Sequence, residues 1–166
     1  DRMRLTLRFD YYSEQDLATV VQQRASALGW ECDEYLPPLI ASRSRGTPRL
    51  ALRLLQSCRR VCRANGETAI TTDHLFRACA LEQLDQLGLG PTERKYLHLV
   101  ANGNTRLNVI ASMLGVPART ISEVTEPYLI RSELVVKDDQ GRRHLTANAR
   151  LYLGSSDDDD FSIEGL

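Results

Sequence analysis

The sequence predicts a mainly α-helical chain with two domains, a four-helix bundle over residues 13–86 and a helix-turn-helix domain with a short β-hairpin over residues 87–154. Three observations support this prediction. Apolar residues recur at helical spacing in four segments of the first half. Two short apolar helices flank a Gly-Val-Pro turn within residues 107–124, and a basic hairpin follows near residues 135–145. Between the domains, the run Leu-Gly-Leu-Gly-Pro at residues 87–91 breaks the helical pattern.

The first helix of the bundle has clear start and stop signals. Residues 4–9, which precede it, alternate like a short strand. Ser13, followed three residues later by Asp16, resembles a capping box, and Gly29 ends the helix. One face of this helix is apolar and carries Leu17, Val20, Val21, Ala25 and Leu28.

The second and fourth helices of the bundle are predicted from similar signals. We expect the second over about residues 35–44, because Pro37 and Pro38 are tolerable only in a first helical turn. Thr71 or Thr72 then caps the fourth helix, which runs as far as Leu84. Together with the third helix, these segments form a small bundle with its own core.

The third helix begins within the motif Arg-Ser-Arg-Gly-Thr-Pro-Arg-Leu-Ala-Leu-Arg-Leu-Leu at residues 43–55. Thr47 is a natural N-cap, and Pro48 suits the first helical position because it has no N–H to lose there. Arg49 then lies beside free backbone N–H groups, where a helix N-terminus favours anions and a guanidinium can clamp a phosphate. An arginine at this position is also a common solvent-exposed residue, so the motif alone leaves both interpretations open.

The helix-turn-helix signature lies in the second domain. Ala111 is small enough for close helix crossing, Gly115 permits the tight turn, and we expect Ile121 and Val124 to pack the second helix against the first. The hairpin that follows completes a winged helix. Winged helices bind DNA in some proteins and dock proteins in others, so this fold leaves two function classes.

The hairpin carries both signs of charge. Lys137, Arg142 and Arg143 can place cations against a DNA backbone. Asp138 and Asp139 at its tip would repel phosphate, although both are also residues that a tight turn favours. Composition leaves DNA contact by the wing undecided.

The composition is that of an ordinary globular chain, with 42% hydrophobic and 26% charged residues. No apolar run approaches the roughly 18 to 20 residues that span a bilayer, so we expect no membrane anchor or signal peptide. All but two of the 21 basic residues are arginine, which suits phosphate binding. Residues 155–166 contain five carboxylates and few apolar residues, and we expect a disordered acidic tail there.

The four cysteines lack paired metal-ligand spacing. Cys58 and Cys62 lie on the apolar stripe of the third helix, so buried reduced thiols are the favoured interpretation. A metal site would need two further ligands, for which His74 and His98 are only formal candidates. We therefore predict no metal.

The motif at residues 43–55, the run Gly-Val-Pro-Ala-Arg-Thr-Ile-Ser-Glu-Val-Thr-Glu-Pro-Tyr-Leu-Ile at residues 115–130, and the wing with Gly141-Arg142 carry a family resemblance. They resemble the C-terminal two-thirds of RuvB, the hexameric AAA+ motor of bacterial Holliday-junction branch migration. The resemblance spans residues 1–153. It implies that residues 1–12 end the AAA+ large domain, that residues 13–86 form its helical lid, and that residues 87–154 form its winged helix.

The resemblance also implies roles for single residues. Arg49 matches the sensor-2 arginine that contacts nucleotide phosphate from the lid, and Tyr12 matches the tyrosine that lies against adenine. A packing role for Tyr12 at the lid hinge is the alternative. Arg2 matches an arginine finger offered to the neighbouring subunit's nucleotide, although its context here is Arg-Met-Arg where the family has Arg-Phe-Gly.

On the wing, Lys137 and Arg142 match two arginines of the family's Arg-Thr-Pro-Arg-Gly-Arg tip, which touch DNA. The middle of the tip differs, since Asp138-Asp139-Gln140 replaces Thr-Pro-Arg and exchanges one cation for two anions. Arg143, one place beyond the family position, can compensate in part.

By this resemblance the intact protein uses ATP, with magnesium held by a large domain absent from this chain. Its partners are a four-way DNA junction or duplex arms, a RuvA-like protein, and copies of itself in a cytoplasmic ring. The chain itself has no GxxxxGK[ST] phosphate loop, so we expect no ATP hydrolysis by it alone. Its start at Asp1 suggests a trimmed piece of a longer protein. The alternative is a non-catalytic winged-helix module that binds DNA or protein, with the bundle as scaffold.

Overall fold

The computed structural model describes residues 10–159, which form two compact units divided between Leu89 and Gly90. The strand expected over residues 4–9 lies outside the described residues, as does Arg2. The prediction of a mainly helical chain with one short hairpin is confirmed. Each unit is described by itself.

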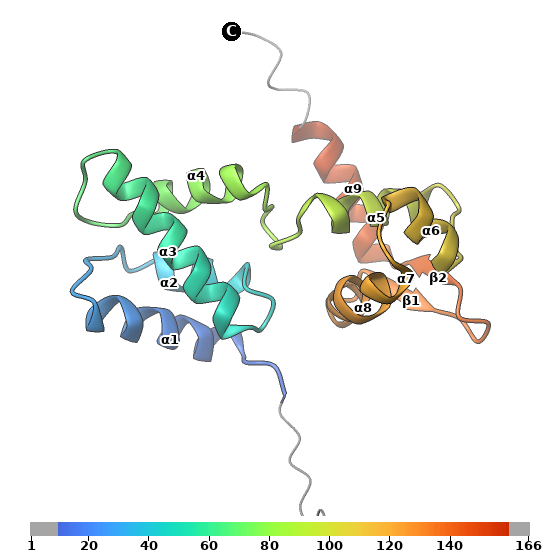
Figure 1. Ribbon diagram of the computed structural model, residues 1–166, viewed down its shortest axis with the longest axis horizontal. Coiled ribbons are helices and arrows are strands. Elements are labelled where there is room, and N and C mark those ends of the chain that lie inside the picture. Colours follow the sequence, from blue (N-terminus) through green and yellow to red (C-terminus); the bar gives the residue numbers. More distant parts are fainter. Residues whose placement is uncertain (1–9, 160–166) are drawn as a thin grey trace, which may run out of the picture. The chain divides into compact units, whose positions relative to one another are not determined.

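The first unit is a bundle of four helices, α1 to α4 (Figure 1). Helix α1 packs on α2, and α3 packs on α4. Their bounds are α1 Glu14–Ala27, α2 Leu36–Ser42, α3 Pro48–Ala64 and α4 Thr72–Glu82. The core between them is aliphatic and includes Leu17, Val21, Leu36, Ile40, Leu55 and Leu75.

The helix starts of this unit follow the sequence signals with one exception. The Ser13 hydroxyl accepts a hydrogen bond from the Asp16 N–H at 3.1 Å, as the capping box predicts. At the start of α4, the Thr71 N–H donates to Nδ1 of the buried His74 at 3.0 Å. Thr47 is the N-cap residue of α3 with extended backbone, but its side chain makes no cap hydrogen bond. Its hydroxyl instead donates to the Arg45 carbonyl at 3.4 Å.

The second unit contains the helix-turn-helix and the wing. Its elements are α5 Pro91–Ala101, α6 Leu107–Leu114, α7 Ala118–Thr120, the π-helical turn Ile121–Thr125, α8 Glu126–Arg131, β1 Val135–Lys137, β2 Arg143–Leu145 and α9 Ala147–Asp159. Strands β1 and β2 pair antiparallel, with Lys137 opposite Arg143. Figure 1 shows α5, α6 and α9 arranged around this hairpin.

The expected packing role of Val124 is wrong. Ile121 and Ala111 are buried as predicted, whereas Val124 is 64% exposed. The helix widens into a π-helical turn here, and the Glu126 N–H donates to the Ile121 carbonyl five residues earlier. This wider turn moves the buried face by one residue, so that Thr125 and Glu126 lie inside instead.

Helix α9 was not predicted. The Thr146 hydroxyl accepts a hydrogen bond from the Ala149 N–H at 3.1 Å and so caps the first turn. Ala149 and Leu153 are buried in the unit. The helix continues to Asp159, five residues into the segment where we expect an acidic tail. Residues 160–166 lie outside the described part.

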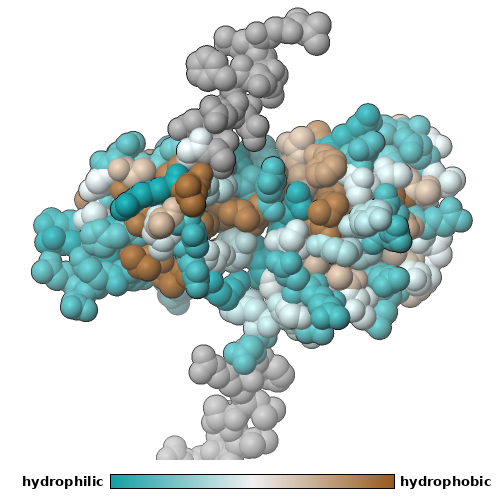
Figure 2. Space-filling view, turned by 180° about the vertical axis from the view of Figure 1, so that it is seen from behind, coloured by the Kyte–Doolittle hydropathy of each residue, from teal (hydrophilic) through white to brown (hydrophobic). Residues whose placement is uncertain are grey.

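The surface is mostly hydrophilic, with exposed hydrophobic residues scattered over the face drawn in Figure 2. Within residues 10–159, no helix combines the length and apolar character that a membrane crossing requires. Cys58, Cys62 and Cys79 are buried free thiols, in agreement with the prediction, whereas Cys32 is only half-buried. Burial raises the pKa of Cys58 to about 12. No cluster of three or more metal-ligating side chains occurs among the described residues.

Candidate nucleotide-facing and DNA-facing sites

The turn between α2 and α3 is built by the first residues of the Arg-Ser-Arg-Gly-Thr-Pro-Arg motif. Arg43 is buried, and its Nη1 donates to the Leu39 carbonyl at 3.0 Å. The buried Ser44 hydroxyl donates to the Ile40 carbonyl at 2.5 Å. These bonds end α2 two residues earlier than the sequence suggested, at Ser42. The first residues of the motif therefore hold the backbone.

Arg45 and Gly46 complete this turn with backbone in the left-handed region, at φ values of 53° and 70°. Nε of Arg45 donates to the Gly88 carbonyl at 2.9 Å. A Cβ atom on Gly46 would lie 2.8 Å from Cβ of Tyr11, so any other residue here would displace the chain before α1. The Tyr12 N–H donates to the Gly46 carbonyl at 3.1 Å. This bond fixes Tyr12 beside the start of α3.

Arg49 lies in the first turn of α3, after Pro48 at the first helical position. It is exposed. Within residues 10–159, neither its backbone N–H nor its guanidinium has a hydrogen-bond or ion-pair partner. The structure thus brings two of the predicted nucleotide residues, Tyr12 and Arg49, to one turn of the bundle. Arg2 cannot be placed, since it lies outside the described residues.

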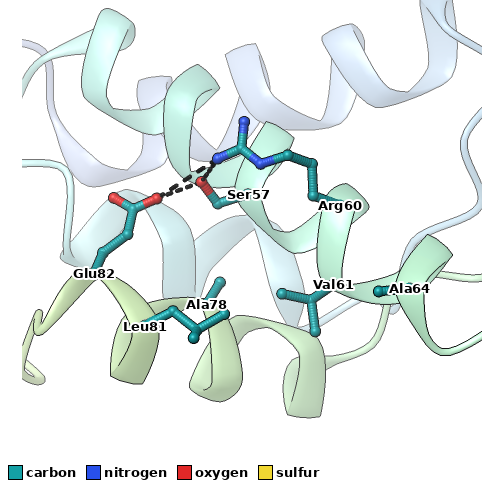
Figure 3. Close-up of a pocket in the computed structure, with 7 residues that line it drawn as sticks. All are labelled: Ser57, Arg60, Val61, Ala64, Ala78, Leu81 and Glu82. Carbon is teal, nitrogen blue, oxygen red and sulfur yellow. Dashed lines mark hydrogen bonds and ion pairs between the residues drawn. The ribbon is translucent and has the colours of Figure 1, made fainter.

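A shallow apolar pocket of about 270 Å³ lies between α3 and α4 (Figure 3). Its wall is made by Val61, Ala64, Ala78 and Leu81, and its polar edge by Ser57, Arg60 and Glu82. Arg60 donates to the Ser57 hydroxyl at 2.7 Å, and that hydroxyl donates to the Glu82 carboxylate. Ser57, the lining residue of α3 nearest to Arg49 along the chain, follows it by about two helical turns, roughly 12 Å along the axis of α3. This pocket is therefore separate from the turn that holds Arg49.

In the second unit, a buried carboxylate joins the wing to the helices. Glu126 accepts hydrogen bonds from the Tyr96 hydroxyl at 2.9 Å and from Arg143 Nε at 2.7 Å. Lys137 Nζ lies 2.5 Å from the other carboxylate oxygen. Burial alone would raise the pKa of Glu126, but the hydrogen bonds from Arg143, Lys137 and Tyr96 lower it below its usual value. Burial and the adjacent carboxylate raise the pKa of Tyr96.

This cluster changes the interpretation of the predicted DNA-contacting cations. The Arg143 side chain is only 10% exposed and is paired with Glu126 in the interior of the unit. The Lys137 side chain is 35% exposed and is paired with Glu126. Arg142 is exposed, and within the described part of the chain its guanidinium has no partner.

The two aspartates of the wing tip differ in role. Asp138 Oδ1 accepts from the N–H groups of Gln140 at 2.9 Å and Arg142 at 2.8 Å, and Oδ2 lies 3.0 Å from His144 Nε2. The hydrogen bond with His144, followed by those from the backbone, lowers the pKa of Asp138. Asp138 is therefore a turn-forming residue. Asp139 is exposed and makes no such bonds to the residues that the structure describes.

Sequence reasoning missed a cleft of about 620 Å³ at the wing tip, formed by residues 105–109 at the start of α6 and residues 140–143 of the wing. Arg106 is exposed there and, like Arg142, has no guanidinium partner within residues 10–159. Two unpaired guanidinium groups from separate elements line this cleft, an arrangement that suits an anion. Only the fold places residue 106 beside residue 142, so spacing along the chain gives no signal for the pair.

Comparison with known proteins agrees with this geometry. A family model described as the RuvB AAA lid domain matches residues 12–85. A second, described as the RuvB C-terminal winged helix domain, matches residues 86–154. The chain belongs to the RuvB family.

Relatives and solved structures extend the RuvB match. Holliday junction branch migration complex subunit RuvB of Cutibacterium acnes is 36% identical over 170 residues, which cover 100% of this chain and 49% of that protein. The protein of that name from Methanoregula boonei is 39% identical over 161 residues, covering 94% and 48%. The structure of the Thermotoga maritima RuvB Holliday junction branch migration motor matches with a TM-score of 0.85 and 32% identity, over 92% of this chain and 52% of that one. This RuvB-family chain thus spans about half the length of the relatives it matches.

Proposed function

We propose that this chain is the nucleotide-sensing lid and DNA-facing winged helix of an ATP-driven motor for Holliday-junction branch migration in recombination and repair. The observation that carries the proposal is the unpartnered Arg49 at the start of α3, next to a Tyr12 that is bonded to Gly46. The family match supports it, because it assigns a lid and a winged helix in this order.

In the intact protein, ATP with its magnesium lies between a large domain and this lid, and its hydrolysis supplies the free energy of movement. Arg49 contacts a phosphate and Tyr12 contacts the adenine. Arg2 faces the nucleotide of the neighbouring subunit in a ring of copies. The whole protein acts in the cytoplasm, where it meets DNA and a RuvA-like junction-binding protein. The chain by itself does not hydrolyse ATP.

The test of the nucleotide role uses a version that includes the large domain. Arg49→Ala is expected to lower DNA-stimulated ATPase and branch migration by at least about tenfold, because a phosphate-contacting charge is lost. Arg63→Ala is the matched control, since Arg63 is exposed near the opposite end of the same helix. Full activity of the Arg49→Ala protein would defeat the assignment. Arg2→Ala in the same version tests whether Arg2 acts as an arginine finger toward the nucleotide of the neighbouring subunit.

The DNA-facing role rests on the cleft that Arg106 and Arg142 line. We expect the chain to bind junction and linear duplex DNA at low salt and to bind both more weakly as salt rises, because phosphate contacts release counterions. Arg142→Gln is expected to weaken binding to every sequence alike and to flatten the salt dependence by about one charge. Lys95→Gln is a control on the exposed part of α5.

A second candidate is a protein-docking winged helix that does not contact DNA. Glu126 engages two of the three wing cations, and Asp139 leaves an unpaired negative charge at the tip. These charges favour docking over DNA contact. Absence of DNA binding at low salt would place this candidate first.

A further inference from the structure

The Glu126 carboxylate lies at the centre of the winged-helix unit and receives side chains from three separate elements. Its residue is fully buried. Tyr96 reaches it from α5, Lys137 from β1 and Arg143 from β2. The carboxylate therefore ties both strands of the wing to a helix of the domain.

The charges of this cluster do not cancel. Glu126 supplies one negative charge, and Arg143 and Lys137 supply two positive charges. Arg143 already contacts both carboxylate oxygens, through Nε at 2.7 Å and Nη2 at 3.3 Å. The side chain of Lys137 is the most exposed of the charged members, at 35% against 10% for Arg143 and 1% for Glu126. The excess positive charge is therefore presented to solvent at Lys137.

The Lys137 ammonium has three N–H donors, and its ion pair with Glu126 leaves others free to meet a second anion. A lysine held by a buried partner loses less side-chain freedom when a phosphate arrives than a freely rotating lysine does. Glu126 is thus placed to keep a cation in position on the surface of the wing.

We propose that Glu126 is a positioning residue for DNA binding, which holds Lys137 where the wing meets a backbone phosphate of the DNA. This inference rests on the proposed DNA-facing function. It differs from the alternative that Glu126 withdraws Lys137 from DNA, and the two alternatives predict opposite changes in affinity.

Glu126→Gln separates them by the sign of its effect. The substitution removes a negative charge near DNA, so general electrostatics predict tighter binding. Loss of the anchor of Lys137 predicts weaker binding instead. We expect the dissociation constant for duplex DNA at low salt to rise on the order of threefold to tenfold, and the salt slope to fall by about one charge.

A double-mutant cycle in the full chain measures whether the losses of DNA affinity caused by substitutions of Glu126 and Lys137 are coupled. A merely structural role of Glu126 predicts no such coupling. Lys137→Gln is expected to give the same loss, and the combined variant no further loss, because both changes remove one phosphate contact. Tyr96→Phe is the matched control, since it removes another donor to the same carboxylate and leaves Lys137 in place. Its DNA affinity is expected to match that of the unmodified chain.

Unchanged or tighter binding by a folded Glu126→Gln chain would overturn the inference, and so would fully additive losses in the combined variant. If Glu126→Gln prevents folding, Lys137→Gln alone decides, because its side chain is partly exposed. An unchanged salt slope in that variant would then refute a phosphate contact by Lys137. Failure of the unmodified chain to bind DNA at low salt refutes the proposed DNA-facing function itself, and is a separate outcome.

Discussion

Three glycines of the lid unit with nearly the same backbone give a graded test of how the turn before α3 is built. Gly66, Gly46 and Gly88 have φ values of 75°, 70° and 69°. A Cβ added at Gly66 meets nothing within 4 Å. At Gly46 it would lie 2.8 Å from Cβ of Tyr11, and at Gly88 it would lie 2.2 Å from the backbone oxygen of Arg43. Substitution by alanine therefore varies the steric contact while the positive φ stays nearly the same.

The expected losses in the free energy of unfolding follow from these contacts. Gly66→Ala costs about 1–2 kcal/mol, the strain of a side chain in the left-handed region. Gly46→Ala costs about 1 kcal/mol more than Gly66→Ala, because relief of the contact with Tyr11 displaces the exposed segment before α1 and weakens the hydrogen bond between Tyr12 and Gly46. Gly88→Ala adds about 1–3 kcal/mol more than Gly66→Ala, since the backbone of Arg43 lies at the end of a packed helix.

Tryptophan fluorescence during denaturant or thermal unfolding measures these losses. Trp30 is the one tryptophan of the chain and packs against the core of the lid unit, so its signal reports that unit. In a domain of this size, 1 kcal/mol corresponds to a shift in Tm of about 4–8 °C. Equal losses for Gly46→Ala and Gly66→Ala would refute the close approach of the Tyr11 segment. A Gly88→Ala loss no larger than that of Gly66→Ala would refute the contact with Arg43.

Three further predictions concern charge and ionisation. Hydrogen bonds lower the pKa of Glu126 in the folded protein, so the ionised carboxylate stabilises the winged-helix unit at pH values above the pKa of Glu126 in the unfolded chain. This stabilisation is lost as the pH falls toward the lower pKa of the folded protein. The midpoint of acid unfolding, followed by circular dichroism, should therefore shift to higher pH in Glu126→Gln. Asp139→Asn should tighten DNA binding without changing Tm, whereas Asp138→Ala should lower Tm because it removes the acceptor of two turn N–H groups. Cys58 should resist alkylation at about pH 8, since only roughly one in ten thousand of its thiols is ionised at that pH when the pKa is about 12. Mass mapping of the alkylated cysteines after brief treatment should find the half-buried Cys32 modified first.

Much of the fold follows from local signals in the sequence. Ser13 with Asp16, Pro48 and Pro91 each occupy the helix starts that their chemistry favours, and Gly115 ends α6 in the left-handed region. These features depend on backbone groups close in the sequence, so a reader of the sequence can find them.

The failures arise where tertiary contacts decide. Helical periodicity places Val124 on the buried face, but the π-helical turn shifts that face to Thr125. The signal available for this change was Pro127, which has no N–H for the regular helical bond to residue 123. Helix α9 was missed because its burial depends on contacts with α5 and β2 that no local pattern reveals.

The site residues divide in the same way. The position of Arg49 in the first turn of α3 was predictable because a helix start and an arginine are adjacent in the sequence. Arg143 was assigned to DNA on charge alone, whereas the structure pairs it with a carboxylate 17 residues earlier. Nothing in the spacing marks Glu126 as the buried partner of two cations on different strands.

Two of the segments that carry the family resemblance, residues 43–55 and 115–130, contain charged residues with different roles. In the first, Arg43, Ser44 and Arg45 donate hydrogen bonds to backbone carbonyls, and Arg49 is exposed at the helix start. In the second, Glu126 is buried and acts on the wing through its partners. A charged residue in such a motif is a candidate ligand contact only when the fold leaves its charge unpaired. Within the first motif, Arg49 meets this criterion. Outside the two motifs, Arg106 and Arg142 also have guanidinium groups without a partner among residues 10–159, and Lys137 is a candidate only through the excess charge of its cluster.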